Sequence, residues 1–452
     1  MYSSYSPLQQ SQLAAQGYYD TQSTYLLVYA PGRNTALRAT LADQLHRKFR
    51  LADTLGSTLT EGVDGVLLVS EDVECMSTAL MCFAKALQDG ADYAVCDAVF
   101  GFGGTTALYQ SRAHLAQNRC ALVSRPLLER CRAAAKDPEN VTELLALAAQ
   151  FCAHPTRIPQ ALLHYERDIC AEDAFSATGK RAFLMSHVLD MTGAPIVLVS
   201  AVPVLRSMGY EVVVLGPSDG GALQLFVDAG AAVITRPGIR ATPNLWGLAL
   251  CADLVLVNTV VMARTVRALS GTAVPVLWWL HDAFAGYPHI AHQIPTKLAE
   301  NVRLYSVGHH AANAMHAVRP DFQIGQLIYG LPDYAAEDFP RCDLGYPADK
   351  PLFATVGSFE RRKGHDIFCA AIRLLPEEVR NKATFLFVGK AADKEMMDAV
   401  RSLTTDCPEN VFYCKRLSRD EIKNLMEQCT CLVCASRDDP MPTFVTEGLI
   451  FG

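Results

Sequence analysis

Short apolar runs alternate along most of the chain with longer stretches in which apolar residues recur every three or four positions. Apolar runs of four to eight residues between Gly, Pro or charged residues are typical of buried strands, and the longer pattern is typical of helices. The clearest predicted strands are residues 25–30, 65–69, 181–187, 211–216, 253–259, 274–282, 352–356, 384–388, 410–414 and 430–434. Helical patterns cover residues 36–49, 78–87, 141–152, 196–205 and 419–429. This alternation predicts an α/β protein built on mostly parallel sheets.

The end of the sequence combines a predicted strand, an acidic turn and a helix. Asp439 lies in the turn, and Glu447 follows with seven residues between, about two turns into a helix that begins near Pro442. Open parallel sheets bind ligands outside the carboxyl ends of their strands, where this turn lies. Two carboxylates that only accept hydrogen bonds suit the hydroxyls of a sugar and a ribose. A solvated turn followed by one charged helix residue remains the alternative for this stretch alone.

A second strand, turn and helix start lies upstream, over residues 351–364. Gly357 and Ser358 follow the predicted strand, and Arg362 and Lys363 stand where the helix begins. A helix N-terminus offers N–H groups and a positive dipole end, which suit a diphosphate. Basic residues after a strand are usually solvated, so this segment alone is weak evidence for a phosphate site. The acidic turn at Asp439 and Glu447 strengthens that interpretation.

Together the two segments resemble the donor domain of the family-4 glycosyltransferases, retaining nucleotide-sugar enzymes with two facing Rossmann-like domains (GT-B). In that family a glycine-to-Lys-Gly segment holds the donor diphosphate, and an acid-x7-acid motif holds the sugar and the ribose. The resemblance gives the diphosphate to Lys363 and Arg362, the ribose to Glu447 and the sugar hydroxyls to Asp439. The family often has Glu in place of Asp439 and Arg in place of Ser358, so Arg362 would substitute for that arginine.

Two segments in the middle of the chain resemble the acceptor domain of the same family. Gly193 and Ala194 stand in a small-residue turn after the strand at 181–187, and a glycine there lets a phosphate or sugar approach the backbone closely. An ordinary strand-to-helix turn is the alternative. His281 ends the strand at 274–282, and the family has a strand that ends in a histidine close to the donor sugar. The resemblance carries that role to His281.

The stretch from Asp64 to His164 resembles the later half of a family-2 glycosyltransferase, which has a single-domain GT-A fold. Where that family has an Asp-x-Asp metal motif, this chain has Ser70, Glu71 and Asp72. One pair of hard oxygen ligands binds a divalent cation only weakly. The sequence therefore predicts a degenerate domain with a structural or partner-binding role.

These observations predict four parts. They are a disordered tail at residues 1–24, a degenerate GT-A-like domain at 25–168, a GT-B acceptor-side Rossmann-like domain at 179–330 and a GT-B donor-binding domain at 346–452. A linker rich in Pro, Asp and Gly separates the last two. The family normally continues with a further strand and helix, so the donor domain is expected to be incomplete at its C-terminal end.

Composition fits a large soluble α/β protein with several buried parallel sheets. The chain has 452 residues, half of them hydrophobic, a net charge of −7 and 15 cysteines. The absence of a dense basic run argues against nucleic acid. No apolar stretch in the sequence reaches membrane-spanning length, so we expect at most peripheral membrane association and a cytoplasmic location. The cysteines fit reduced thiols, and the C-x-x-C of Cys431 and Cys434 lacks a second pair, so no metal is expected.

The sequence thus predicts a glycosyltransferase that moves a hexose-type sugar from a nucleotide-sugar donor to a glycan, surface-polysaccharide or lipid-linked saccharide acceptor, with retention. His281 and Asp439 are the predicted catalytic residues, and the donor is a substrate, with no cofactor. Two alternatives stay open: a non-catalytic subunit that binds a glycan or a partner glycosyltransferase, and a sugar-nucleotide epimerase of the same architecture.

Overall fold

The computed structural model of the chain describes residues 18–56, 60–101, 107–110, 119–175, 179–218, 220–236, 243–331, 339, 345–347, 349–415 and 417–451, with side chains omitted at 18–20, 107–110 and 243–246. Residues 1–17 of the predicted tail and most of the predicted linker lie outside this set. The chain forms two compact units. Unit 1 comprises residues 1–257, 264–276 and 299–301, and unit 2 comprises residues 258–263, 277–298 and 302–452.

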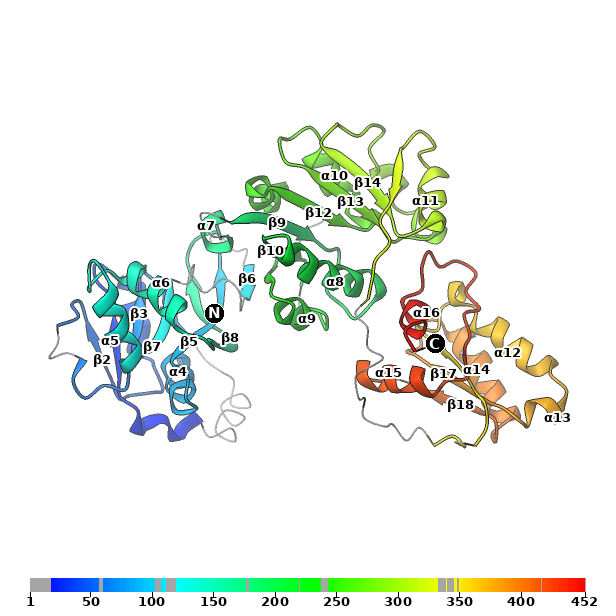
Figure 1. Cartoon of the computed structure of the whole chain (residues 1–452), viewed down its shortest axis with the longest axis horizontal. Helices are drawn as coiled ribbons and strands as arrows, with labels where there is room; N and C mark the ends of the chain where they lie inside the picture. The colour runs from blue at the N-terminus through cyan, green and yellow to red at the C-terminus, as the bar shows by residue number, and fades with distance from the viewer. Residues whose placement is uncertain are drawn as a thin grey trace. The chain divides into compact units, whose positions relative to one another are not determined.

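The first part of unit 1 is a mixed sheet with helices on it (Figure 1). It begins with the 3₁₀ helix η1 (Tyr18–Ser23), inside the predicted tail, so described structure begins before residue 24. The strands are β1 (Leu26–Tyr29), β2 (Phe49–Ala52), β3 (Gly65–Val69), β4 (Glu74–Cys75), β5 (Tyr93–Phe100), β6 (Ala107–Gln110), β7 (Cys120–Ser124) and β8 (Thr156–Tyr165). The helices are α2 (Thr35–Leu41), α4 (Ala79–Gln88), α5 (Arg125–Ala134), α6 (Val141–Phe151) and α7 (Ala171–Ala174).

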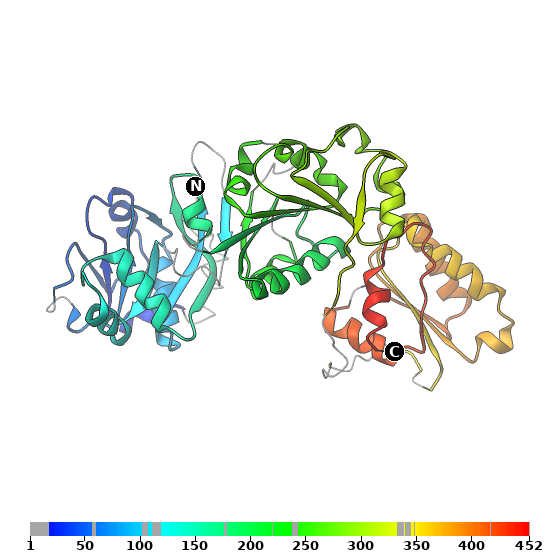
Figure 2. The ribbon, with the colours of Figure 1, turned by 45° about the horizontal axis from the view of Figure 1, so that its top comes forward.

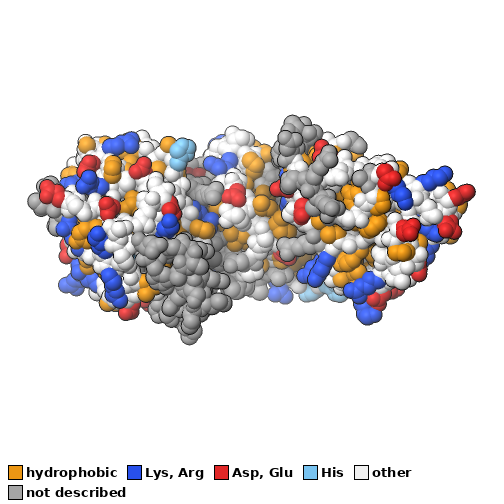
Figure 3. All heavy atoms as spheres, turned by 90° about the horizontal axis from the view of Figure 1, so that it is seen from below, with side chains coloured by type: hydrophobic (Ala, Val, Ile, Leu, Met, Phe, Trp, Pro, Cys, Tyr) orange, Lys and Arg blue, Asp and Glu red, His pale blue; other side chains and the backbone are white. Residues whose placement is uncertain are grey.

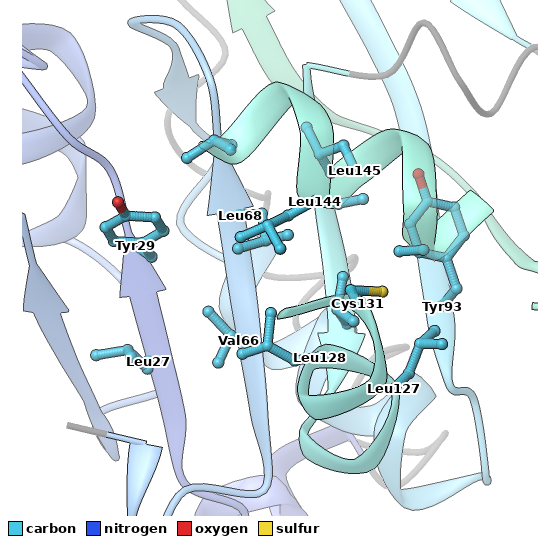
Figure 4. Close-up of a cluster of buried hydrophobic side chains, with 14 of the residues drawn as sticks. Leu27, Tyr29, Val66, Leu68, Tyr93, Leu127, Leu128, Cys131, Leu144 and Leu145 are labelled. Carbon is cyan, nitrogen blue, oxygen red and sulfur yellow. The ribbon is translucent and has the colours of Figure 1, made fainter. Parts of the chain in front are cut away.

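The core of this part lies between the sheet and helices α5 and α6. Figure 4 shows side chains from β1, β3 and β5 packed against leucines of the two helices. The contributing residues share almost complete burial, and they include Leu27, Tyr29, Val66, Leu68, Tyr93, Leu127, Leu128, Cys131, Leu144 and Leu145. Side chains point alternately to the two faces of a strand, which is why residues 27 and 29 of β1, and 66 and 68 of β3, share this core.

The second part of unit 1 is a parallel βαβ array. It contains β9 (Lys180–Met185), α8 (Gly193–Ser207), β10 (Tyr210–Gly216), α9 (Leu223–Asp228), β11 (Ala232–Thr235), the 3₁₀ helix η3 (Pro243–Cys251), β12 (Leu254–Asn258) and α10 (Ala263–Leu269). The strand order within unit 1 is β12-β9-β10-β11-β6-β5-β7-β3-β1-β2. Strand β11 pairs antiparallel with β6, so one sheet runs through both parts of the unit.

Unit 2 begins with η4 (Val260–Met262). Its first strands are β13 (Val276–Leu280), β14 (Val302–Ser306) and β15 (Ile324–Gln326), and between these strands lie η5 (Phe284–Gly286), η6 (Ala291–Gln293) and α11 (His309–His316). Strands β14 and β15 are parallel, as the predicted doubly wound pattern requires.

The rest of unit 2 is a second, fully parallel sheet in the order β18-β17-β16-β19. Its strands are β16 (Leu352–Val356), β17 (Thr384–Val388), β18 (Val411–Cys414) and β19 (Cys431–Leu432). Its helices are η7 (Arg361–Lys363), α12 (His365–Leu374), α13 (Glu377–Arg380), α14 (Lys394–Asp406), α15 (Arg419–Gln428) and α16 (Thr443–Gly448).

Alternation along the central strand β17 builds both faces of this sheet. Phe385 and Phe387 pack with residues of α12 and α14, whereas Leu386 and Val388 pack with Leu425 of α15. Helix α16 lies beside α15 (Figures 1 and 2). The predicted α/β architecture with several parallel-sheet regions is therefore correct.

Two surface properties complete the description. In the part of the chain that the structure describes, no helix is long and apolar enough to cross a membrane. On the face in Figure 3, Lys and Arg side chains are interspersed with Asp and Glu among the described residues. The net negative charge is therefore not gathered into a one-signed patch on that face.

Candidate functional site

The chain makes a sharp turn after strand β16. Gly364 follows η7 with φ +69°, a conformation that favours glycine, and begins α12. A Cβ atom there would lie 1.9 Å from the carbonyl oxygen of Ala435, so only glycine fits. The backbone of this turn is thus pressed against the chain segment that follows β19. Lys363, the residue before this glycine, is brought beside that segment.

Hydrogen bonds hold the two segments together. The N–H groups of Arg437 and Asp438 donate to the carbonyl oxygen of Arg362 at 2.7 and 3.3 Å. The guanidinium of Arg437 also donates to both carboxylate oxygens of Asp366, at 2.7 and 2.6 Å. This anchoring places the acidic turn directly over the basic segment that precedes α12.

Lys363 and Asp439 meet in this arrangement. The Lys363 ammonium donates a short hydrogen bond to Oδ2 of Asp439, and the two side chains are only 17% and 8% exposed. Arg362 lies 3.7 Å from the same oxygen and donates through Nε to Glu360 at 2.9 Å. Ser358 donates to the other oxygen of Glu360. Two cations and two carboxylates therefore form one network.

Glu447 lies on α16 and is paired as well. Its side chain is 4% exposed and accepts a hydrogen bond from Arg419 at 2.5 Å, the first residue of α15. The Tyr329 hydroxyl donates to the Met441 carbonyl at 3.3 Å. Burial raises the pKa of Tyr329, and the carboxylates of Glu447 and Asp439 raise it further against a hydrogen bond with Thr446. Both acids therefore act on one hydroxyl.

His365 begins α12 and is almost fully buried, at 2% exposure. Its ring packs against Phe359 with 4.4 Å between centroids, and neither ring nitrogen has a hydrogen-bond partner among the described residues. Burial, and after it the nearby charge of Lys363, lower the pKa of His365 to about 4, although the charges of Asp366 and Glu360 act in the opposite direction. The imidazole is therefore neutral at pH 7.

A second cluster lies at the end of β13. His281 follows the strand, and its ring lies 4.6 Å from that of Trp279, centroid to centroid. Asp282 accepts a hydrogen bond from the N–H of Val260 at 2.6 Å. Burial raises the pKa of Asp282 to about 6, although hydrogen bonds from the N–H groups of Val260 and His281 act in the opposite direction. A carboxyl group that titrates near neutrality is a feature of functional sites.

Asp438, the neighbour of Asp439, ties the acidic turn to the segment after β13. It accepts hydrogen bonds from the N–H groups of Ala285 at 2.8 Å and Phe284 at 3.3 Å, and it pairs with Nε2 of His310 at 2.7 Å. Burial raises the pKa of Asp438, but these hydrogen bonds and the charge of His310 outweigh it and lower the pKa overall.

Comparison with known families identifies two regions of the chain. Residues 178–316 match Glycosyl-transferase family 4, and residues 338–452 match Glycosyl transferases group 1. The chain is a glycosyltransferase of the GT-B type. The second match covers the Lys363, Asp439 and Glu447 segments, and the first covers Gly193 and His281.

The glycosyltransferase also resembles solved structures at low sequence identity. One is a UDP-forming trehalose-phosphate synthase from Burkholderia xenovorans, with 12% identity, a TM-score of 0.43, and 61% of this chain and 82% of that chain covered. Another is WaaG, a glycosyltransferase involved in lipopolysaccharide biosynthesis, with 16% identity, a TM-score of 0.46, and 60% and 79% covered. No curated protein sequence matches the chain.

The structure of the glycosyltransferase brings some predicted site residues together. Lys363, Arg362 and Asp439 form one network, and Ser358 joins it through Glu360. Gly357 follows β16, and its N–H donates to the carbonyl oxygen of Val388 at 2.9 Å.

Other predicted residues are placed separately. Gly193 and Ala194 are the first two residues of α8 in unit 1. His281 directly follows β13 in unit 2, where its ring packs against the ring of Trp279.

The acids of the first part of unit 1 have structural partners. Asp72 accepts hydrogen bonds from the N–H groups of Thr35, Ala36 and Leu37, at 2.9, 3.1 and 3.1 Å, at the start of α2. Glu71 pairs with Arg167 at 2.6 Å. The carboxylate predicted as a weak metal ligand thus satisfies the first turn of a helix.

Sequence reasoning missed the roles of four polar residues of the site. Arg419 and Glu360 neutralise partners of opposite charge, and His310 and Asp438 form the pair near η5. Arg419 carries one signal in the sequence: it follows Ser418, which has Glu421 three residues later in a helix-capping pattern. Glu360 has its partners, Ser358 and Arg362, two residues away on either side. His310 and Asp438 carry no local signal, because they lie 128 residues apart in the chain.

Proposed function

We propose that this glycosyltransferase transfers a hexose-type sugar from a nucleotide-sugar donor to a glycan, surface-polysaccharide or lipid-linked acceptor, with retention. The observation that carries the proposal is the cluster of Lys363, Arg362 and Asp439, where two cations and an acid meet at the start of α12. A site for a sugar diphosphate needs both charge signs, because the leaving diphosphate is anionic and the sugar presents hydroxyl donors.

The proposed roles follow the chemistry of each group. Lys363 and Arg362 offset the charge that grows on the departing diphosphate. Asp439 accepts hydrogen bonds from sugar hydroxyls, and Glu447 accepts them from the ribose. His281 contacts the sugar, and no protein nucleophile is assigned.

Two glycine-containing turns, one in each unit, have proposed roles of their own. Gly193 and Ala194 admit the donor or acceptor phosphate to the start of α8, and Gly357 and Ser358 form the turn after β16. Because side-chain cations supply the positive charge, we propose that transfer needs no metal, and activity should persist in excess EDTA.

We propose that residues 25–168 are a degenerate GT-A-like domain with a structural or partner-binding role. The support is that both of its acids already have partners. Asp72 accepts hydrogen bonds from the N–H groups at the start of α2, and Glu71 pairs with Arg167. A carboxylate with four hydrogen-bond donors, including the Thr35 hydroxyl, has little capacity left for a cation.

Calorimetry of the full chain with UDP, ADP and GDP, and with their glucose conjugates, tests the donor site. We expect one nucleotide to bind and Lys363→Ala to weaken it by about one to two decades, the scale of a lost charge-assisted contact. Lys394→Ala removes an exposed lysine of the same unit and is the matched control. If no nucleotide binds, or if Lys363→Ala binds diphosphate as well as the parent chain, the assignment is wrong.

A further inference from the structure

The contact between Lys363 and Asp439 is built into the fold. The backbone bonds from Arg437 and Asp438 to Arg362 fix the spacing of the two segments, and Gly364 lets them approach. Both side chains of the pair are largely shielded from water, where an ion pair is stronger than at the surface. The lysine assigned to the diphosphate is therefore already bound by an acid of the same site.

Among the described residues, both cations of this cluster already face a carboxylate. Arg362 faces Glu360 at 2.9 Å and Asp439 at 3.7 Å, and Lys363 faces Asp439. A diphosphate that approaches Lys363 must displace the carboxylate of Asp439. A lysine can make this exchange, because its compact ammonium group sits on a flexible stem with three donors.

The displaced carboxylate needs new donors. An ionised carboxylate only accepts hydrogen bonds, and leaving it buried without a partner costs a desolvation penalty. The hydroxyls of the transferred sugar provide such partners. A nucleoside diphosphate lacks that sugar, and its ribose hydroxyls are assigned to Glu447. The two ligands therefore differ in whether Asp439 can release the lysine at low cost.

We propose that Asp439 competes with the donor diphosphate for Lys363 until a donor sugar occupies its carboxylate. Asp439 thereby discriminates the intact nucleotide sugar from the spent nucleoside diphosphate. When the sugar has left, the carboxylate recaptures the lysine and weakens retention of the product. This role rests on the proposed function, since it requires a nucleotide-sugar donor at Lys363.

Calorimetry on the full chain separates this role from simple sugar binding. The probes are the nucleoside diphosphate that binds the parent chain, among UDP, ADP and GDP, and its glucose conjugate. Asp439→Asn should tighten binding of the bare diphosphate by about three- to tenfold, within the range of one charge-assisted contact. The same variant should lose most of the preference for the glucose conjugate. Asp398→Asn removes one negative charge from an exposed pair in the same unit and should change neither affinity.

A second background checks that the effect passes through the lysine. In a Lys363→Met chain, Asp439→Asn should no longer tighten diphosphate binding, because the competition has been removed. If Asp439→Asn misfolds by circular dichroism, Asp439→Ser is measured in its place, with the same expected tightening.

The outcomes distinguish the two proposals. If the parent chain binds a diphosphate through Lys363 but neither Asp439 variant binds it more tightly, the competition is refuted and the donor site stands. Equal tightening in the Lys363→Met background also refutes the competition, because the effect then comes from general charge. If the parent chain binds no nucleotide or conjugate at all, the proposed function and this inference both fail.

Discussion

Arg419 and Glu447 form an ion pair across α15 and α16, with 2.5 Å between Nη2 and Oε1 and only 4% of the Glu447 side chain exposed. The arginine is about one-third exposed, so one end of the pair is in water and the other is inside the protein. This pair fixes the acid that we assign to the ribose.

Replacing Arg419 with Gln should destabilise unit 2. The change leaves the buried Glu447 carboxylate without its charged partner, and we expect a loss of about 1–3 kcal/mol in the free energy of unfolding. Lys394→Gln breaks an exposed pair with Asp398 and is the matched control, with an effect below about 1 kcal/mol. Denaturant titration measures both. Equal midpoints for the two variants would show that the pair contributes nothing.

His365 should make the protein sensitive to acid. Its pKa is lowered from 6.5 to about 4. Between these pH values His365 is protonated in the unfolded chain and neutral in the folded chain. Stability should therefore fall between pH 6.5 and 4, by up to about 3 kcal/mol for this group. His365→Phe should remove that share of the loss. His289→Phe, at an exposed position, is the control, and identical pH profiles for all three chains would contradict the prediction.

Much of the donor region could be predicted because its signals are local. Strands β16 and β17 lie where the apolar runs predict them, and the two motif segments bring Lys363 and Asp439 into contact. The partners of these residues are harder to predict from the sequence. Glu447 pairs with Arg419 from 28 residues upstream, and only the packing of α15 beside α16 brings the two together.

The first part of unit 1 shows a different limit of prediction from sequence. The helix predicted at 36–49 ends at Leu41, and only its last predicted residue, Phe49, lies in β2 (Phe49–Ala52), which pairs parallel with β1. At Phe49, pairing with a neighbouring strand overrides the local helical pattern. The pairing of β6 with β11 carries no sequence signal, since it depends on two distant segments meeting at one sheet edge.

Asp72 gives a prediction about the degenerate domain. Its pKa is lowered because hydrogen bonds from residues 35–37 outweigh its burial, so its contribution to stability is present above pH 3.8 and is lost as the pH falls through the folded pKa. Asp72→Ala should cost about 1 kcal/mol, the usual loss for a helix cap, and leave nucleotide binding unchanged. Thermal unfolding and calorimetry check the two parts. A fall in transferase activity of more than about tenfold that excess Mn²⁺ restores would instead indicate a working second catalyst.

The last prediction concerns Asp438, which holds the acidic turn against the segment after β13. Its carboxylate accepts the N–H groups of Ala285 and Phe284 and pairs with His310, so Asp438→Ala removes three contacts at once. Asp438→Asn keeps an acceptor oxygen but loses the charge. It should therefore weaken the attachment of the turn less than Asp438→Ala does. Amide hydrogen exchange is the sharpest measurement, because the Ala285 amide should exchange faster in the order parent, Asn variant, Ala variant.

The two functions of the acidic turn can then be separated. Asp438→Ala should also weaken nucleotide binding modestly, because the neighbouring Asp439 and Lys363 lose part of their support. Phe284 and Ala285 donate through backbone N–H groups, so side-chain changes there do not imitate the loss. His310→Gln removes only the imidazole partner and should leave both amides protected. If the Ala285 amide exchanges at the same rate in all chains, the Asp438 side chain does not hold this segment, and the position of Asp439 depends instead on contacts such as those of Arg437 with Arg362 and Asp366.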